Sequence, residues 1–170
     1  GGMFGMAPPL LAQATRVLHA MREGGGVPFS DFAPECRHAI DIMNRGNYDA
    51  RLVDYWLAQL PALCARLREG GRVLDVGCGH GHAAIALARG FPASEIVGVD
   101  PHGASIAEAR EAAAAAGVKV TFVQGLLDTI PTAPGFDLIT IFDSLHDLPD
   151  PVAVLAQIRA RLAADGVLFV

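Results

Sequence analysis

VLDVGCGHG, residues 73–81, is the stretch that decides the fold of this 170-residue chain. A short β-branched run ends in a turn with glycine at alternate positions, Gly77, Gly79 and Gly81. Glycines allow positive φ angles and close approach to the backbone, so we expect a ligand at the carboxyl end of this strand. Dinucleotide-binding folds use the spacing G-x-G-x-x-G, whereas this loop has G-x-G-x-G and an acid, Asp75, two residues before its first glycine. That acid would repel a pyrophosphate and favours a ligand that carries positive charge.

Strand and helix patterns alternate after the glycine loop. Strands are expected at 72–76, 96–99, 118–123, 136–142 and 166–170, and helices at 83–89, 105–116 and 151–162. This alternation predicts a parallel sheet with right-handed crossovers, and so an α/β, Rossmann-like doubly wound core over residues 70–170. Residues 1–69 are expected to be helical instead, at 8–22, 35–44 and 49–68, with Pro61 kinking the last helix.

Composition and charge exclude several classes of protein. Apolar residues make up 52% of the chain and charged residues 18%, which excludes a disordered protein. The sequence has no apolar run long enough to cross a bilayer and no pattern of a signal peptide, so a cytoplasmic protein without membrane contact is expected. A net charge of −5 without a basic stripe argues against nucleic-acid binding. Three scattered cysteines, Cys36, Cys64 and Cys78, predict neither a disulfide framework nor a metal site.

Asp100 closes the second predicted strand in the segment IVGVD, residues 96–100. A carboxylate at this place can accept hydrogen bonds from the two hydroxyls of a ribose. The alternative is that Asp100 caps the following helix, since Pro101 comes directly after it. The preceding glycine loop favours the ribose-binding role.

Four segments together resemble the class I S-adenosylmethionine (SAM) dependent methyltransferases, in their order and spacing. They are VLDVGCGHG (73–81), VGVD (97–100), FVQG (122–125) and FDLITIFDSLHDLPDP (136–151). The resemblance covers roughly residues 71–170. It implies SAM as the cofactor and a Rossmann-like core, with the helical residues 1–69 as a lid over the cofactor site.

The resemblance also implies a role for individual residues. Gly77, Cys78 and Gly79 would border the methionine part of SAM, with Asp75 near its ammonium group. Asp100 would hold the ribose and Pro101 would pack near the adenine. Gly125 and Leu126 lie where the family often has Gly-Asp, whose acid binds the adenine amino group, so here the backbone of Leu126 with apolar packing, or Asp128, would take that part. Phe142 and Asp143 would line the methyl-donor end.

The segment Leu145-His146-Asp147 is the clue to reaction type. It resembles the L-H-D segment of small-molecule O-methyltransferases, whose histidine is the general base on the acceptor hydroxyl. An uncharged phenol is a poor nucleophile until its proton leaves, and a neutral imidazole can accept that proton. Asp147 would orient the ring or stay exposed. The alternative is that His146 only caps the loop between strand and helix.

Members of the family usually finish with two more strands beside the fifth, and this sequence stops at Val170. We therefore expect an incomplete sheet whose fifth strand is an exposed edge, with a second copy or a missing domain covering it. The segment GGGVPFSDF, residues 24–32, with the helical pattern that follows it, also resembles a bacterial subgroup of methyltransferases that carry a winged-helix domain upstream. The expected function is methyl transfer from SAM to a small molecule, at oxygen. The rival is a regulatory, non-catalytic SAM-binding module, and a nicotinamide oxidoreductase ranks third.

Overall fold

The computed structural model describes residues 2–28 and 31–170, which belong to two compact units, Gly1–Asn47 and Tyr48–Val170. Within its described residues the smaller unit has helices α1 (Gly2–Ala12), α2 (Ala14–Glu23) and α3 (Pro34–Asn47). The prediction of a single helix over 8–22 is wrong, because α1 and α2 are separate helices. The amide of Gln13 bonds to the carbonyl of Leu10, three residues back, and this tighter turn separates α1 from α2.

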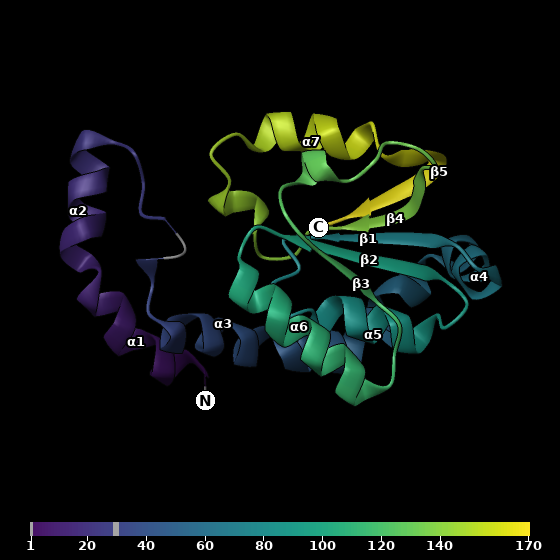
Figure 1. Ribbon diagram of the computed structural model, residues 1–170, viewed down its shortest axis with the longest axis horizontal. Coiled ribbons are helices and arrows are strands. Elements are labelled where there is room, and N and C mark those ends of the chain that lie inside the picture. The colour runs from purple at the N-terminus through teal and green to yellow at the C-terminus, as the bar shows by residue number, and fades with distance from the viewer. Residues whose placement is uncertain (1, 29–30) are drawn as a thin grey trace. The chain divides into compact units, whose positions relative to one another are not determined.

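The larger unit is built on a five-stranded parallel sheet in the order β3-β2-β1-β4-β5. Its strands are β1 (Arg72–Val76), β2 (Glu95–Asp100), β3 (Thr121–Gln124), β4 (Phe136–Thr140) and β5 (Leu162–Phe169). The order reverses between β1 and β4, and the carboxyl ends of the central strands meet at one edge of the sheet (Figure 1). In open α/β sheets this reversal is where ligands bind.

Helices cover both faces of the sheet, which confirms the doubly wound arrangement. They are α4 (Pro61–Glu69), α5 (His82–Gly90), α6 (Gly103–Ala116) and α7 (Pro151–Arg159). Val73 on β1 packs in the cluster that includes α4, α5 and α6, whereas Leu74 packs in the cluster that includes Ile158 of α7. Because successive side chains of a strand point to opposite faces, an unbroken apolar strand such as β1 can fill both layers.

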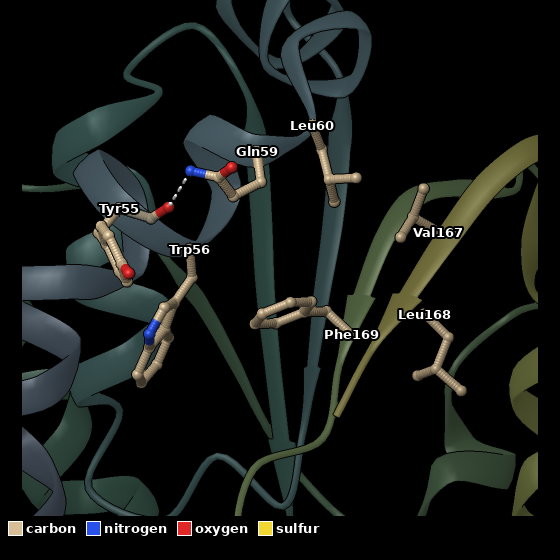
Figure 2. Close-up of a pocket in the computed structure, with 7 residues that line it drawn as sticks. All are labelled: Tyr55, Trp56, Gln59, Leu60, Val167, Leu168 and Phe169. Carbon is tan, nitrogen blue, oxygen red and sulfur yellow. Dashed lines mark hydrogen bonds between the residues drawn. The ribbon is translucent and has the colours of Figure 1, made fainter.

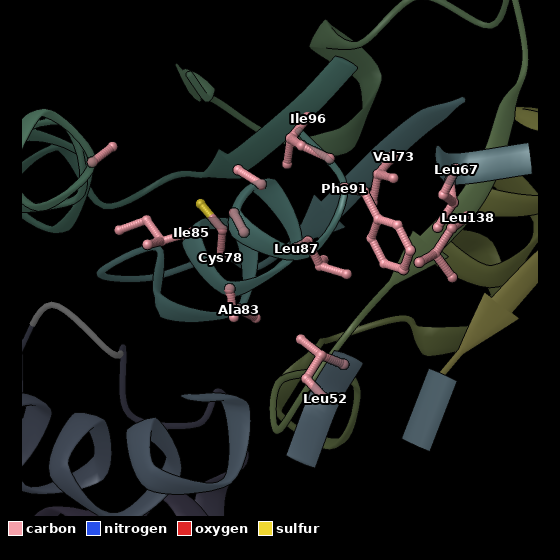
Figure 3. Close-up of a cluster of buried hydrophobic side chains, with 14 of the residues drawn as sticks. Leu52, Leu67, Val73, Cys78, Ala83, Ile85, Leu87, Phe91, Ile96 and Leu138 are labelled. Atoms are coloured by element: carbon pink, nitrogen blue, oxygen red, sulfur yellow. The ribbon is translucent and has the colours of Figure 1, made fainter. Parts of the chain in front are cut away.

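Residues 48–69 belong to the larger unit, and not with the helices before them. A π-helix, η2 (Tyr48–Trp56), and a 3-10 turn, η3 (Leu57–Gln59), precede α4. Buried Leu52, Leu57 and Leu67 lie in the same cluster as Val73 and Phe91, so these residues are part of the core (Figure 3). The compact-unit boundary therefore lies after Asn47, whereas the sequence divided the chain near residue 70.

Pro61 starts a helix and does not kink one. The residue before it, Leu60, has the non-helical angles φ −119° and ψ 66°, and Pro61 occupies the first turn of α4. A proline disfavours a helical conformation in the residue before it but is well tolerated at the start of a helix. The pattern read as one helix over 49–68 is therefore three consecutive segments.

The fifth strand is longer than expected, since it begins at Leu162 and not at 166. Its register shifts between the pairs Phe136–Leu162 and Leu138–Val167, so the additional residues form an irregularity near its start. In the described chain β5 pairs with β4 alone and is one of the two edge strands of the sheet, with β3 at the other side. None of the helices within residues 2–28 and 31–170 combines the length and apolar character needed to cross a membrane.

Candidate functional site

The glycine loop lies between β1 and α5, at the carboxyl edge of the sheet. Gly77, Gly79 and Gly81 have φ angles of +67°, +49° and +78°, in the left-handed region that favours glycine. The amides of Gly77 and Cys78 both donate to the carbonyl oxygen of Val99, at 2.8 and 3.2 Å. These bonds tie the start of the loop to β2.

Two of the loop glycines are also required by close packing. A Cβ atom on Gly77 would lie 2.6 Å from Oγ of Ser144, and one on Gly81 would lie 2.6 Å from the ring of Phe122. Gly79 is different, because a Cβ atom there would meet nothing within 4 Å. The backbone at Gly79 is thus the part of the loop that a ligand can approach.

Asp100 links the end of β2 to the glycine loop. Its Oδ2 accepts a hydrogen bond from the amide of Gly79 at 2.9 Å, and its Oδ1 accepts one from the amide of His102 at 2.8 Å. The residue that caps α6 is His102, whose Nδ1 accepts from the amide of Ser105 at 3.3 Å. Each carboxylate oxygen of Asp100 retains a further lone pair for another donor.

Asp75 lies beneath the loop and is only 2% exposed. The hydroxyl of Thr140 on β4 donates to its Oδ1 at 2.7 Å, while Oδ2 has no hydrogen-bond partner among residues 2–28 and 31–170. Burial raises the pKa of Asp75 to about 7, and the nearby carboxylate of Asp100 adds to the rise, whereas Thr140 and the backbone of Ala84 oppose it. Asp75 can therefore change its charge near neutral pH.

Cys78 contributes its backbone to the loop and its side chain to the core. The thiol is buried against Gly98, and Figure 3 shows it among the apolar side chains of that cluster. Burial, together with the charges of Asp75 and Asp100, raises the pKa of the Cys78 thiol far above its usual range. The thiol is accordingly neutral and unreactive.

The segment after β4 carries the predicted base. Asp143 has a φ angle of +50°, which is unusual for a residue other than glycine, and a short 3-10 turn, η5 (Leu145–Asp147), follows. The His146 side chain is 66% exposed, with its Nε2 3.6 Å from Oδ1 of Asp147 and 4.0 Å from Oδ1 of Asp143. Through Ser144, which packs on Gly77, this segment touches the glycine loop.

The remaining predicted cofactor residues follow β2 and β3. The amide of Gly125 donates to the backbone oxygen of Asp100 at 3.0 Å, so the ends of β2 and β3 lie together. Pro101 is exposed, Leu126 is 62% exposed, and Asp128 is exposed in the 3-10 turn η4 (Leu127–Thr129). The structure thus places each of these residues at the same edge of the sheet as the glycine loop.

Four aromatic rings gather beside the end of β5. Phe142 lies between Tyr48, Trp56 and Phe169, with ring centroids 5.3, 6.2 and 5.7 Å away. Next to them is an open pocket of about 630 Å³ (Figure 2). Its lining consists of Tyr55, Trp56, Gln59, Leu60, Val167, Leu168 and Phe169. Trp56 therefore both packs against Phe142 and lines the pocket.

Sequence reasoning did not single out Thr140 or Ser144, although each contacts the site. Thr140 is the only polar residue of the otherwise apolar run Leu138–Ile141, and this interruption was the available signal in the sequence. Ser144 gave no such signal, because its importance arises from its contact with Gly77, 67 positions away in the chain.

Residues 73–166, more than half of the chain, match the family model described as "Methyltransferase domain". A curated relative, the ubiquinone biosynthesis O-methyltransferase of Actinobacillus pleuropneumoniae serotype 5b, is 34% identical over 106 residues, which cover 59% of this chain and 44% of that protein. The chain thus spans less than half the length of the curated relatives it matches.

Two solved structures are similar as well. The YcgJ protein of Bacillus subtilis is 31% identical with a TM-score of 0.54, over 65% of this chain and 48% of that one. The plantazolicin methyltransferase BpumL, solved in complex with S-adenosylhomocysteine (SAH), has a TM-score of 0.63 over 95% of this chain and 59% of its own. At 19% identity, BpumL is similar in fold alone.

Proposed function

The chain belongs to the methyltransferase domain family, and from this premise we propose that it binds SAM at the glycine loop and serves the transfer of a methyl group to a small-molecule acceptor. The observation that carries the proposal is the pair of carboxylates around the loop. Asp75 lies beneath it, and Asp100 is bonded to the amide of Gly79 at its open side. Two acids at this place suit a cationic ligand that also carries a ribose.

The residues present fit the chemistry of SAM. Asp75 is a buried carboxyl group in surroundings of low polarity, where a nearby positive charge acts strongly, so it would favour the sulfonium and ammonium groups from beneath the loop. Asp100 would accept hydrogen bonds from the ribose hydroxyls with its remaining lone pairs. The exposed backbone of Gly125 and Leu126 would border the adenine, with Pro101 against its ring. Phe142 and Asp143 would border the methyl group.

We propose that the acceptor atom is oxygen and that His146 is the general base. The curated relatives that match this chain are named O-methyltransferases. When bound, SAM supplies an electrophilic methyl group, and the acceptor hydroxyl must lose a proton as it attacks. Because the carboxylates of Asp147 and Asp143 both lie toward Nε2, Nδ1 is the ring nitrogen that would take this proton, with Asp147 holding the ring.

A regulatory SAM-binding module is the second candidate. It is favoured by Leu126, an exposed apolar residue at the position where the family often has an acid for the adenine. The two candidates differ in the effect of His146→Ala, which abolishes methyl transfer in an enzyme of the proposed type and leaves SAM binding intact in both. A cytoplasmic location, a lid formed by the N-terminal helices and a partner along β5 stay predictions from the sequence.

Calorimetric titration with SAM and with its demethylated product, S-adenosylhomocysteine (SAH), tests the proposal. We expect micromolar binding that falls at least tenfold in Asp100→Ala, since two hydrogen bonds to a charged acceptor are lost. Asp150→Ala is the matched control, because Asp150 also accepts a backbone amide, that of Ala153 at 2.9 Å, but at the start of α7. Absence of binding to folded wild-type protein, or binding of NAD instead of SAM, would overturn the proposal.

A further inference from the structure

The hydroxyl of Thr140 lies between two oxygen atoms of β1. It donates to Oδ1 of Asp75 at 2.7 Å, and the carbonyl oxygen of Leu74 is 3.5 Å away. Thr140 itself is completely buried, as the last residue of β4, where it pairs with Asp75 on one side and with Phe169 on the other. A buried polar residue in the centre of an apolar sheet needs a reason, because valine would fill the same volume without a hydroxyl group.

This hydroxyl can form a hydrogen bond with Oδ1 of Asp75 in both protonation states of the carboxyl group. When the carboxyl group is charged, Thr140 donates to it, as the 2.7 Å contact shows. When the group is neutral, its own proton can be donated to Oγ1, and the threonine hydroxyl can then turn toward the carbonyl of Leu74. Serine can do the same, whereas valine can do neither.

The groups that act on Asp75 come from every element around it, and within the described part of the chain none of them is a cation. They are the Thr140 hydroxyl on β4, the Asp100 carboxylate at the end of β2 and the backbone of Ala84 on α5. The Cys78 thiol of the loop is neutral, and the charge of Asp75 helps to raise its pKa. Burial disfavours a negative charge at Asp75 most strongly, and the carboxylate of Asp100 repels it as well. Without a cation above the loop, the neutral form of Asp75 is thus supported near neutral pH.

We propose that Thr140 is a positioning residue that lets Asp75 change its charge, so that binding of the cationic cofactor is coupled to release of one proton from Asp75. The inference rests on the proposed SAM site. In the coupled step the carboxyl group of Asp75 loses its proton to the buffer, and the carboxylate that remains is stabilised by the positive charge of the cofactor and by the donated bond from Thr140. Because binding and ionisation favour each other, affinity rises as the pH approaches neutrality.

The experiment is titration with SAM between pH 5 and 7 in the wild type and in Asp75→Asn, Thr140→Val and Thr140→Ser. In this pH range the α-amino group of SAM stays protonated, because an ordinary α-amino group has a pKa near 8. Asp75→Asn is the reference, since it lacks the titrating carboxyl group of Asp75 and any remaining pH dependence of its Kd comes from SAM or from other residues. We expect the wild-type Kd to fall by up to tenfold per pH unit and that of Asp75→Asn to stay flat. Thr140→Val should shift the rise in affinity upward by about one pH unit, the equivalent of one lost hydrogen bond, while Thr140→Ser follows the wild type.

Calorimetry in two buffers of different ionisation enthalpy counts the proton directly. At pH 6 the wild type should release close to one proton per SAM bound more than Asp75→Asn does, and thermal melts of each variant without SAM check that it is folded. A wild-type Kd and proton count equal to those of Asp75→Asn would overturn the inference while SAM binding itself stands. A wild type that binds no SAM would overturn the proposed function instead.

Discussion

The amide of Gly79 donates a hydrogen bond to Oδ2 of Asp100 over 2.9 Å, and this bond joins the open part of the glycine loop to the end of β2. The two residues are 21 positions apart in the chain, since Gly79 precedes helix α5 and Asp100 follows it. The bond holds the Gly79 backbone and the Asp100 carboxylate at fixed places relative to each other. A ligand that meets both therefore finds a site already formed, which lowers the entropy lost on binding.

Gly79→Ala should weaken SAM binding more than tenfold with only modest destabilisation of the fold. The added methyl group would point into open space beside the loop, where the cofactor is proposed to lie. The positive φ of +49° adds strain of about 1 kcal/mol. Calorimetric titration with SAM and urea unfolding measure the two effects separately.

Gly117→Ala is the matched control for this change. Gly117 also has a positive φ, +67°, and a Cβ atom added to it would likewise meet open space, but it caps the far end of α6. It should lose similar stability and keep wild-type affinity for SAM. Equal loss of affinity in both variants would mean that the strain, and not the proposed cofactor site, is responsible.

Asp75→Asn should change how stability depends on pH. An aspartate in an unfolded chain has a pKa near 4, whereas burial raises that of folded Asp75 to about 7. Between these values the folded state holds a proton that the unfolded state has lost. The free energy of unfolding therefore falls as pH rises from about 4 to 7, by up to about 1.4 kcal/mol per unit.

Urea unfolding without SAM at pH 4.5 to 7.5 measures this slope. Asp75→Asn should flatten it. Glu95→Gln is the control variant and should keep the wild-type slope. The hydrogen bond from Arg72 lowers the pKa of Glu95, so the contribution of Glu95 to the free energy of unfolding is lost only below this pH range. An unchanged slope in Asp75→Asn would contradict the buried, readily protonated state described for this residue.

Much of the fold could be predicted because the sheet depends on local patterns. The apolar run before the glycine loop, and its repetition along the chain, indicated the strands and the Rossmann-like order, which the structure confirms. The resemblance to class I SAM-dependent methyltransferases is confirmed by the family match. The errors lie where tertiary packing decides. Residues 48–69 have a helical pattern that does not reveal its partner, and only the buried contacts of Leu52 and Leu67 assign them to the core.

The site could be predicted only where a single segment carries it. The glycine loop and Asp100 are recognisable from neighbouring residues, whereas Thr140 and Ser144 gain their roles from contacts with residues more than 60 positions away. Nor did any sequence pattern indicate that Asp75 is enclosed beneath the loop, since alternation along β1 is hidden in a strand that is buried on both faces.

Cys78→Ala should leave SAM affinity within about twofold of the wild type, although Cys78 stands in the middle of the loop. Its backbone is part of the loop and its thiol packs in the core, so the change removes packing and lowers the free energy of unfolding by about 1–2 kcal/mol. The three cysteines are buried, and a thiol reagent should accordingly modify none of them in the native protein and all three after unfolding. Rapid labelling of Cys78 in the folded protein, or a large loss of affinity, would contradict this placement.

His146→Ala should lower kcat/KM for methyl transfer by about 10²- to 10⁴-fold, the usual contribution of a general base, while the Kd for SAM stays within about twofold. Simple phenols and catechols are suitable acceptors for the assay, with SAH formation as the readout. Asp147→Asn should have a smaller effect, because the Asp147 carboxylate lies 3.6 Å from Nε2 of His146 and would only orient the ring.

Unchanged turnover in His146→Ala would show that this exposed histidine has only a structural part in the loop between β4 and α7. Tight SAM binding by the wild type without methylation of any acceptor would favour the regulatory module, since the exposed Leu126 already departs from the family's usual acid.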